Sequence, residues 1–362
     1  MASTKAVTAH ASALARLPAA RPSMADVARM AGVSTQTVSR YFTGVGYVRD
    51  DTRDRIAAAV EHLGYRRTQS ARSFRTQRTN LIGVLSMGPI NYGSAEALTG
   101  LGLAAHEAGL TLTITQMDVE RDDPDWRTDV QQTLEHLLSI PVDGIVVVTP
   151  YAGVEGLLRD RMGGTTPLVT ISDRPETLAA VASIHSHEAA RQATQHLLDL
   201  GHTDVVHVAG PAGRNEAHER IRGYRDAMAA ANLDPTVVDL ATDWSPRAGD
   251  LAALQLDPGR DFTAVLCGND EIALGFVSGM ARRGFHAPGD FSIVGTDDMP
   301  TAAYFSPPLT TMRLDFRGLG IHAFSMLQSE LATGDPAHYH SADPQLVVRT
   351  STGRRTTPAP HV

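Results

Sequence analysis

The feature that most constrains this chain is a series of short apolar runs that alternates with helical stretches from residue 81 onward. Runs that are nearly continuous in Val, Ile and Leu are typical of strands covered by helices on both faces, and such strands form parallel sheets. There are too many runs for one comfortable sheet, so we expect two α/β subdomains. The predicted strands are Leu81 to Leu85, Leu110 to Thr115, Gly144 to Val148, Leu168 to Ile171, Val205 to Ala209, Ala264 to Cys267 and Phe291 to Val294.

A different pattern precedes these runs. Residues 24–43 read as two short amphipathic helices separated at Gly32, which is the pattern of a helix-turn-helix. A third helix, Arg53 to Leu63, ends at Gly64 and completes a headpiece of three helices. The apolar residues at helical spacing in the first two helices are Val27, Ala28, Ala31, Val33, Val38 and Phe42.

Residues that favour helix starts, and polar residues on the outer face of the helices, also support the helix-turn-helix interpretation. Ser23 with Asp26 has the spacing of a capping box, and Ser34 stands immediately before the second helix. The helical period leaves four polar side chains on the outer face of this segment, where they can meet base edges. They are Thr35, Gln36, Ser39 and Arg40.

Charge is divided unequally along the chain. Residues 21–80 hold 11 Arg and no Lys against 5 acidic residues, whereas residues 81–362 hold 19 basic against 35 acidic residues. A basic segment beside an acidic body favours attraction of nucleic-acid phosphates at one end and discourages indiscriminate contact elsewhere. The sequence therefore predicts DNA binding by the headpiece.

Cysteine content and hydropathy limit which classes of protein this chain can belong to. The single cysteine, Cys267, lies in an apolar run, which indicates a buried thiol and excludes a disulfide framework or a multi-cysteine metal site. No stretch approaches the roughly 18 apolar residues of a membrane helix, and residues 1–22 lack the apolar core of a secretory signal. We therefore predict a cytoplasmic protein without a membrane partner.

From about Met24 to Ser351 the chain resembles the lac repressor family of bacterial transcription regulators. The resemblance implies a helix-turn-helix headpiece (23–66), a hinge (67–80) and an α/β core (81–352) of two Rossmann-like subdomains, of periplasmic-binding-protein type I. Tails at 1–22 and 353–362 flank these parts, and the subdomains comprise 81–184 with 316–341, and most of 185–312. The resemblance rests on Asp26-Val27-Ala28, Ala31-Gly32-Val33-Ser34, Gln36-Thr37-Val38-Ser39-Arg40, Gly201-His202, Ala209-Gly210-Pro211, Gly268-Asn269-Asp270, Ala273-Leu274-Gly275, Val294-Gly295, Asp297-Asp298 and Pro308-Leu309-Thr310-Thr311.

The resemblance also implies DNA contacts. Thr35, Gln36 and Arg40 match major-groove positions, and their side chains suit a thymine methyl, adenine and guanine. By their chemistry, Ser34, Thr37 and Ser39 can donate to phosphates, although Thr37 and Ser39 are equally explained as helix-surface hydroxyls.

The hinge departs from the family pattern. The segment Thr68 to Arg75 resembles a helix that folds in the minor groove, where Ala71 and Phe74 would contact DNA. Phe74 replaces the commoner leucine wedge, and Arg67 stands where proline is frequent. The alternative for Phe74 is packing on the core.

A pocket between the subdomains follows from the resemblance. Arg220, Trp244, Asn269 and Asp297 match effector-binding positions, with Phe316 and Asp173 as further candidates, whereas Asp270 and Asp298 are interpreted as structural. Asp243-Trp244-Ser245 resembles galactoside-responsive members, so a sugar such as a galactoside or another disaccharide is the first expectation and a purine or other corepressor the alternative. Residues 91–97 depart from those members, which leaves the exact ligand open.

The implied mechanism is repression by a homodimer bound to a near-palindromic, double-stranded operator, relieved when sugar shifts the core to another state. We do not expect an enzyme, because the chain lacks a nucleophile elbow, a phosphate loop and a zinc helix, and we expect no cofactor or metal. His185 to Glu188 is the best metal-like cluster, and we interpret it as structural. The remaining alternative, an exported sugar-binding protein without a DNA role, is opposed by the fused headpiece.

Overall fold

The computed structural model describes residues 22–66, 78–119, 125–149, 151, 154, 157, 166–173, 180–336 and 342–355. The chain divides into two compact units, Met1–Thr79 and Asn80–Val362. The predictions for Arg67, Ala71, Phe74 and the hinge helix lie outside the described residues, as do those for residues 1–21 and 356–362.

The first unit contains the three expected helices, α2 (Met24–Ala31), α3 (Thr35–Thr43) and α4 (Asp50–Leu63). Ser23 and Asp26 form the predicted capping box, and Gly32 ends α2 in the left-handed conformation at φ 64°. The third helix begins at Asp50, three residues before its predicted start, because Asp50 and Asp51 fill its first turn, where the helix dipole favours acidic side chains.

A small core holds these helices together. Val27, Val38 and Ile56, one from each helix, are fully buried, and Phe42 and Tyr65 pack against them with their rings 5.7 Å apart. The apolar period read from the sequence therefore corresponds to the inner face of the headpiece.

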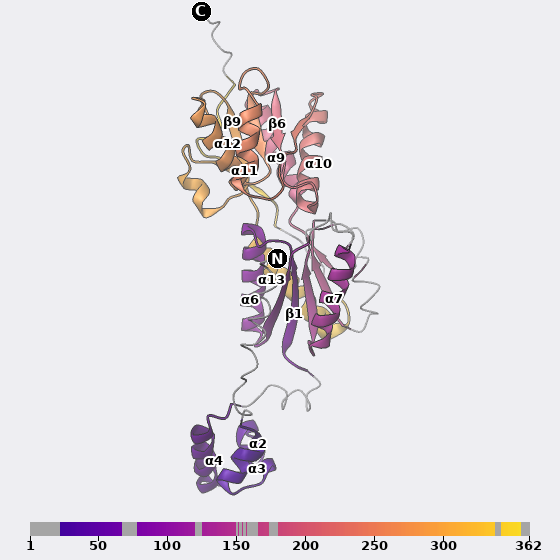
Figure 1. Ribbon diagram of the computed structural model, residues 1–362, viewed down its shortest axis with the longest axis vertical. Helices are drawn as coiled ribbons and strands as arrows, with labels where there is room; N and C mark the ends of the chain where they lie inside the picture. Colours follow the sequence, from indigo (N-terminus) through magenta and orange to yellow (C-terminus); the bar gives the residue numbers. More distant parts are fainter. Residues whose placement is uncertain are drawn as a thin grey trace, which may run out of the picture. The chain divides into compact units, whose positions relative to one another are not determined.

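The second unit begins with a parallel sheet in the order β2-β1-β3-β4-β5. Helices flank both of its faces, α6 and α13 on one and α7 on the other (Figure 1). The elements are β1 (Leu81–Met87), α6 (Tyr92–Glu107), β2 (Thr111–Met117), α7 (Trp126–Ser139), β3 (Gly144–Val148), β4 (Leu168–Ile171), β5 (Val181–Ala182) and α13 (Phe316–Thr333).

A second sheet has the order β11-β10-β9-β8-β6-β7 and is parallel except for β11, which pairs antiparallel with β10. The two sheets confirm the predicted α/β core. The elements are α9 (Ser186–Asp199), β6 (Val205–Val208), α10 (Asn215–Ala230), β7 (Thr236–Val238), α11 (Pro246–Gln255), β8 (Ala264–Cys267), α12 (Asp270–Arg282), β9 (Ser292–Asp297), the 3-10 helix η1 (Pro300–Tyr304), β10 (Thr310–Arg313) and β11 (Gln345–Val347).

Late segments of the chain complete both sheets. Helix α13 follows β10 but packs on α6 of the first sheet, where a Cβ at Gly320 would lie 1.9 Å from the Ala97 carbonyl oxygen. The chain then returns to the second sheet, where Ser351 Oγ donates to the Ile293 carbonyl at 2.7 Å and the Arg355 backbone N–H donates to the Leu200 carbonyl at 2.9 Å. We call residues 345–355 the terminal strap.

All seven predicted strands are present, and the described residues contain four further strands that were not predicted: β5, β7, β10 and β11. Three of these have only two or three residues, too few to show a period. β10 was missed because Thr310 and Thr311 are polar by composition, although both are fully buried.

Candidate functional site

Helix α3 exposes the predicted DNA-reading side chains. Thr35, Gln36 and Arg40 are exposed, whereas Thr37 and Ser39 are half-buried. Ser34 Oγ accepts a hydrogen bond from the Thr37 backbone N–H at 3.1 Å and lies 2.9 Å from Thr37 Oγ1. Ser34 and Thr37 therefore fix the start of α3 in the free protein, whatever they contact on DNA.

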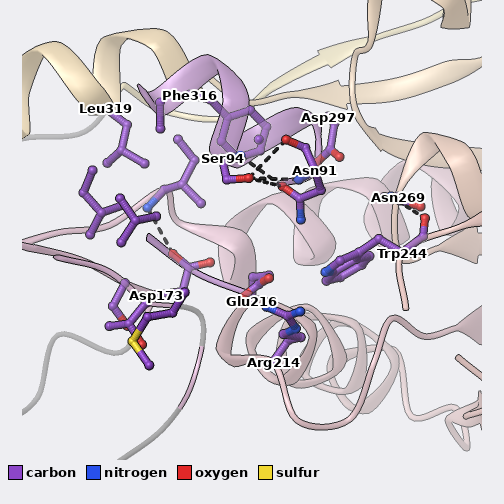
Figure 2. A pocket seen from close by; sticks show the side chains of 18 of the residues that line it. Asn91, Ser94, Asp173, Arg214, Glu216, Trp244, Asn269, Asp297, Phe316 and Leu319 are labelled. Carbon is purple, nitrogen blue, oxygen red and sulfur yellow. Dashed lines mark hydrogen bonds between the residues drawn. The ribbon is translucent and has the colours of Figure 1, made fainter. Parts of the chain in front are cut away.

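A cavity in the second unit, which we call the central cavity, brings together all six predicted effector residues. Figure 2 shows five of them with their neighbours. The walls of the cavity come from both sheets, at the carboxyl ends of strands and the starts of the helices that follow. This is the position at which open α/β sheets bind ligands. The six residues are Asp173, Arg220, Trp244, Asn269, Asp297 and Phe316.

Arg220 on α10 is the best-anchored charge of the cavity. Its side chain is 4% exposed, Nη2 donates to Asp297 Oδ1 at 3.2 Å, and Nη1 donates to the Gly268 carbonyl. The guanidinium carbon lies 5.2 Å from the centre of the Trp244 ring, a cation–π distance. These contacts preorganise Arg220 and leave its buried Nε without a hydrogen-bond partner.

Trp244 lies flat against the chain at Gly210. A Cβ at Gly210 would be 2.2 Å from the indole ring, so any side chain there would displace the ring. Asn269 Nδ2 donates to the Trp244 carbonyl at 3.2 Å, and its Oδ1 accepts from the Ile272 backbone N–H at 2.8 Å, which caps α12. Asn269 therefore has a structural role that sequence reasoning did not assign.

Asp297 stands at the end of β9 with φ at 114°, an unusual conformation for a residue with a side chain. Burial raises its pKa to about 6, against the opposing effect of Arg220. Asp270 accepts from the Met299 backbone N–H at 2.8 Å and from Thr311, and Asp298 accepts from Arg349 at 2.6 Å. As expected, Asp270 and Asp298 brace loops beneath the site.

Asp173 follows β4 on the opposite wall. Its Oδ1 accepts from Ser183 Oγ at 2.8 Å and from the Ile184 backbone N–H at 3.0 Å, while Oδ2 is buried without a partner. Three residues that line the cavity, Asp173, Arg220 and Trp244, thus each have a buried polar atom without a hydrogen-bond partner among the described residues. Such atoms are costly unless a ligand or water satisfies them.

The sequence reasoning missed Arg214 and Glu216, which also line the cavity. Arg214 lies over the Tyr151 ring at 4.5 Å, and Asn215 Nδ2 donates to Ser172 Oγ at 3.0 Å, so the start of α10 contacts the first sheet's wall. Glu216 and Arg220 are four residues apart on one helix, which places them on one face. That spacing was a signal available in the sequence.

The first sheet's wall is largely apolar. Asn91 and Ser94, in the segment that departs from the family, bond mainly to each other: Asn91 Oδ1 accepts from the Ser94 backbone N–H at 3.0 Å. Phe316 closes this side and meets the Tyr92 ring edge-on at 6.1 Å. The remaining lining here is mostly apolar and includes Met87, Ala97, Val148, Ile171, Ile184 and Leu319.

The metal-like cluster is dispersed. His187 Nε2 lies 2.7 Å from Asp226 Oδ2, and Glu188 accepts from Arg191 at 2.7 Å, which lowers the Glu188 pKa to about 2. Among the described residues no group of three His, Cys, Asp or Glu could hold a metal ion. Within the same residues, none of the helices is both long and apolar enough to span a bilayer.

Two family models match the chain. Residues 23–68 match bacterial regulatory proteins of the lacI family, and residues 194–352 match a periplasmic binding protein-like domain. A relative described as the HTH-type transcriptional repressor PurR of Vibrio campbellii is 33% identical over 342 residues, 90% of this chain and 97% of its own length. The protein of the same description from Vibrio cholerae serotype O1 is 34% identical over 316 residues, with 83% and 89% covered.

Solved structures show the same architecture. The lac repressor dimer bound to operator and the anti-inducer ONPF superposes with a TM-score of 0.82 at 24% identity, and the match covers 92% of this chain and all of that one. At this identity the likeness is one of fold. It includes a helix-turn-helix headpiece joined to a core with two parallel-sheet subdomains.

Proposed function

The chain belongs to the lacI family of bacterial regulatory proteins, and from this membership we propose that it represses transcription under the control of a small ligand held in the central cavity. It is a DNA-binding regulator of that family. The observation that carries ligand control is the set of three buried polar atoms, on Asp173, Arg220 and Trp244, that lack partners around one cavity. Relatives described as repressors support a binding protein rather than an enzyme.

Operator reading is assigned to α3. Thr35, Gln36 and Arg40 would read base edges, and Ser34, Thr37 and Ser39 would donate to phosphates. The exposure of the first three side chains and the basic headpiece support this assignment. We infer a homodimer on a near-palindromic operator, because two headpieces related by a two-fold axis match two half-sites. Such a regulator would act in the cytoplasm.

Two effector classes remain, and different observations support them. The repressors named PurR, which match this chain along most of their own length, support the purine alternative better than the sugar. The flat faces of Trp244 and Phe316 also suit a heteroaromatic ring. The sugar alternative is supported by the indole beside Arg220, Asn269 and Asp297, a set suited to a hydroxylated ring. We place the purine first.

The test measures fluorescence-anisotropy binding of the full chain to DNA from its own upstream region, at fixed salt, with hypoxanthine, guanine, galactose, galactosamine, lactose and cellobiose added separately. A purine that changes operator affinity supports the first class, whereas a sugar that does so supports the second. The sign of the change tells corepression from induction. If no compound changes affinity or binds, ligand control by these two classes is wrong.

The same assay tests α3. Arg40→Ala should weaken operator binding by about 1–3 kcal/mol if Arg40 pairs with guanine. Arg260→Ala removes one exposed arginine of the core, where Arg260 pairs with Asp257 and Asp261, and should leave binding unchanged. Equal losses in both variants would indicate a general charge effect and contradict base reading by Arg40.

A further inference from the structure

The central cavity holds a carboxylate that neither sequence motifs nor the comparisons assign, Glu216 at the first turn of α10. Figure 2 shows Glu216 beside Arg214 on one wall and Asp173 nearby on the other. The two carboxylates come from different subdomains, because Asp173 follows β4 of the first sheet and α10 packs on α9 beside the second.

Asp173 has one oxygen committed to the fold and one free. Oδ1 accepts from Ser183 and Ile184, and the buried Oδ2 has no hydrogen-bond partner among the described residues. The charged groups around Glu216 are Arg214 and Arg220 on its own helix and Asp173 opposite, while Asp297 lines the same cavity. Two acceptor groups therefore face one space from opposite walls.

We propose that Glu216 and Asp173 together form a two-walled acceptor site that selects an effector presenting N–H or O–H donors to both carboxylates, an exocyclic amine being the best match. An amino group has at least two hydrogens to donate, whereas carboxylates only accept when ionised. A ligand held in this way joins the two subdomains. The inference rests on the proposed function, since it specifies the chemistry of the ligand in that cavity.

Electrostatics supports the pairing. Burial and, more weakly, the Asp173 charge raise the pKa of Glu216 to about 7 against the opposing effects of Arg214 and Arg220. A donor-bearing ligand stabilises the ionised form, so the acceptor site should strengthen as pH rises from 6 to 8.

The test titrates the full chain with two matched pairs of probes, guanine against hypoxanthine and galactosamine against galactose, and follows tryptophan fluorescence. In each pair the first compound carries an amine that the second lacks. Wild type should bind the amine member of one pair more tightly at pH 8 than at pH 6. Glu216→Gln should weaken that binding about tenfold to a hundredfold at pH 8 and less at pH 6.

Glu219→Gln is the matched control, because Glu219 lies one turn along the same helix, is bound by Arg222 at 2.8 Å and does not line the cavity. It should keep wild-type affinities. The proposal is overturned if Glu216→Gln weakens the binding of neither amine compound, or if it weakens the binding of both members of a pair equally. Which pair binds at all decides the effector class separately.

A measurement without ligand tests whether Glu216 and Asp173 interact, even if no probe binds. Because its native pKa is raised, Glu216 should make the wild type lose melting temperature relative to Glu216→Gln as pH rises from about 4.5 to 7. Asp173→Asn should reduce this difference, since it removes the opposing charge. Parallel melting curves for wild type and Glu216→Gln would overturn the acceptor pair, whereas failure of all probes alone would overturn only the proposed effector classes.

Discussion

Two arginines show how differently the two units of this protein use charge. Arg40 of the headpiece is exposed on α3, whereas Arg220 of the core is 4% exposed and bound to Asp297 and the Gly268 carbonyl. An exposed side chain costs little to present, and in the proposed operator complex DNA would provide the binding energy. A buried one must be held by other polar groups, so the ion pair of Arg220 affects the stability of the core as well as the proposed ligand site.

The largest expected difference comes from removing the buried charge. Arg220→Met should destabilise the core by about 3–5 kcal/mol, because it leaves Asp297 buried without its partner. The loss should be smaller at pH 5, where Asp297 takes up a proton more readily. Urea unfolding monitored by tryptophan fluorescence gives the free energy of unfolding. Arg260→Met, at an exposed arginine, is the control. A loss below 1 kcal/mol for Arg220→Met would show that the two units do not differ in how they use arginine.

The second-largest effect on stability is expected from a steric change in the cavity. Gly210→Ala should cost about 1–3 kcal/mol and alter tryptophan emission, because the new methyl group would displace the Trp244 ring. Gly289→Ala serves for comparison, since a Cβ there meets its nearest atom at an ordinary 3.7 Å. If both variants melt like the wild type, the ring is free to move and the cavity is less rigid than its contacts indicate.

Carboxyl groups of the two units should respond to pH with opposite signs. The native pKa values of Asp297 and Glu216 are raised to about 6 and about 7, so these two groups should make the core lose stability as pH rises from about 4 to 7. Buried His207, whose pKa is lowered to about 4, contributes with the opposite sign over the same range. Each group contributes at most about 1.4 kcal/mol for each pH unit.

Asp26 of the headpiece behaves in the opposite way. Hydrogen bonds from Ser23 lower its pKa, so its contribution is lost as pH falls below its ordinary value of 3.8. Hydrogen exchange of α2 to α4, compared with core tryptophan fluorescence between pH 3 and 8, checks both signs. Parallel trends in the two units would contradict the opposite pKa shifts.

The smallest change concerns a cap. Ser34→Ala should destabilise the headpiece by about 1 kcal/mol, because the Thr37 backbone N–H loses its side-chain acceptor and keeps only the Ser34 carbonyl. Faster hydrogen exchange in α3, with the core unchanged, is the expected result in the full chain. Ser39→Ala, which removes a hydroxyl from the same helix without removing a cap, should exchange at nearly the wild-type rate.

The headpiece was easier to predict than the cavity. Capping at Ser23 and Ser34 and the buried period through Val27 and Val38 are local, so neighbouring residues in the sequence define them. The long strands were also readable, because burial on both faces makes them continuously apolar. Strands of two or three residues, such as β5, carry too little pattern.

The cavity depends on residues far apart in sequence. Family resemblance identified six of its residues, but it missed Glu216, whose spacing from Arg220 was visible while its place opposite Asp173 was not. It assigned Asn269 to the ligand, which stays a prediction, and did not reveal that the same amide caps α12 and donates to the Trp244 carbonyl. Such roles depend on how β4, α10 and α12 pack together in the folded chain, and no local sequence pattern specifies that packing.

The terminal strap and α13 have a consequence for synthesis on the ribosome. The headpiece needs only its own residues, so it can fold as soon as α4 has emerged. Neither sheet of the core can be finished until residues 316–355 follow, since α13 covers the first and the strap closes the second. During translation, a folded headpiece is therefore carried for many seconds by a nascent core whose central cavity is still incomplete.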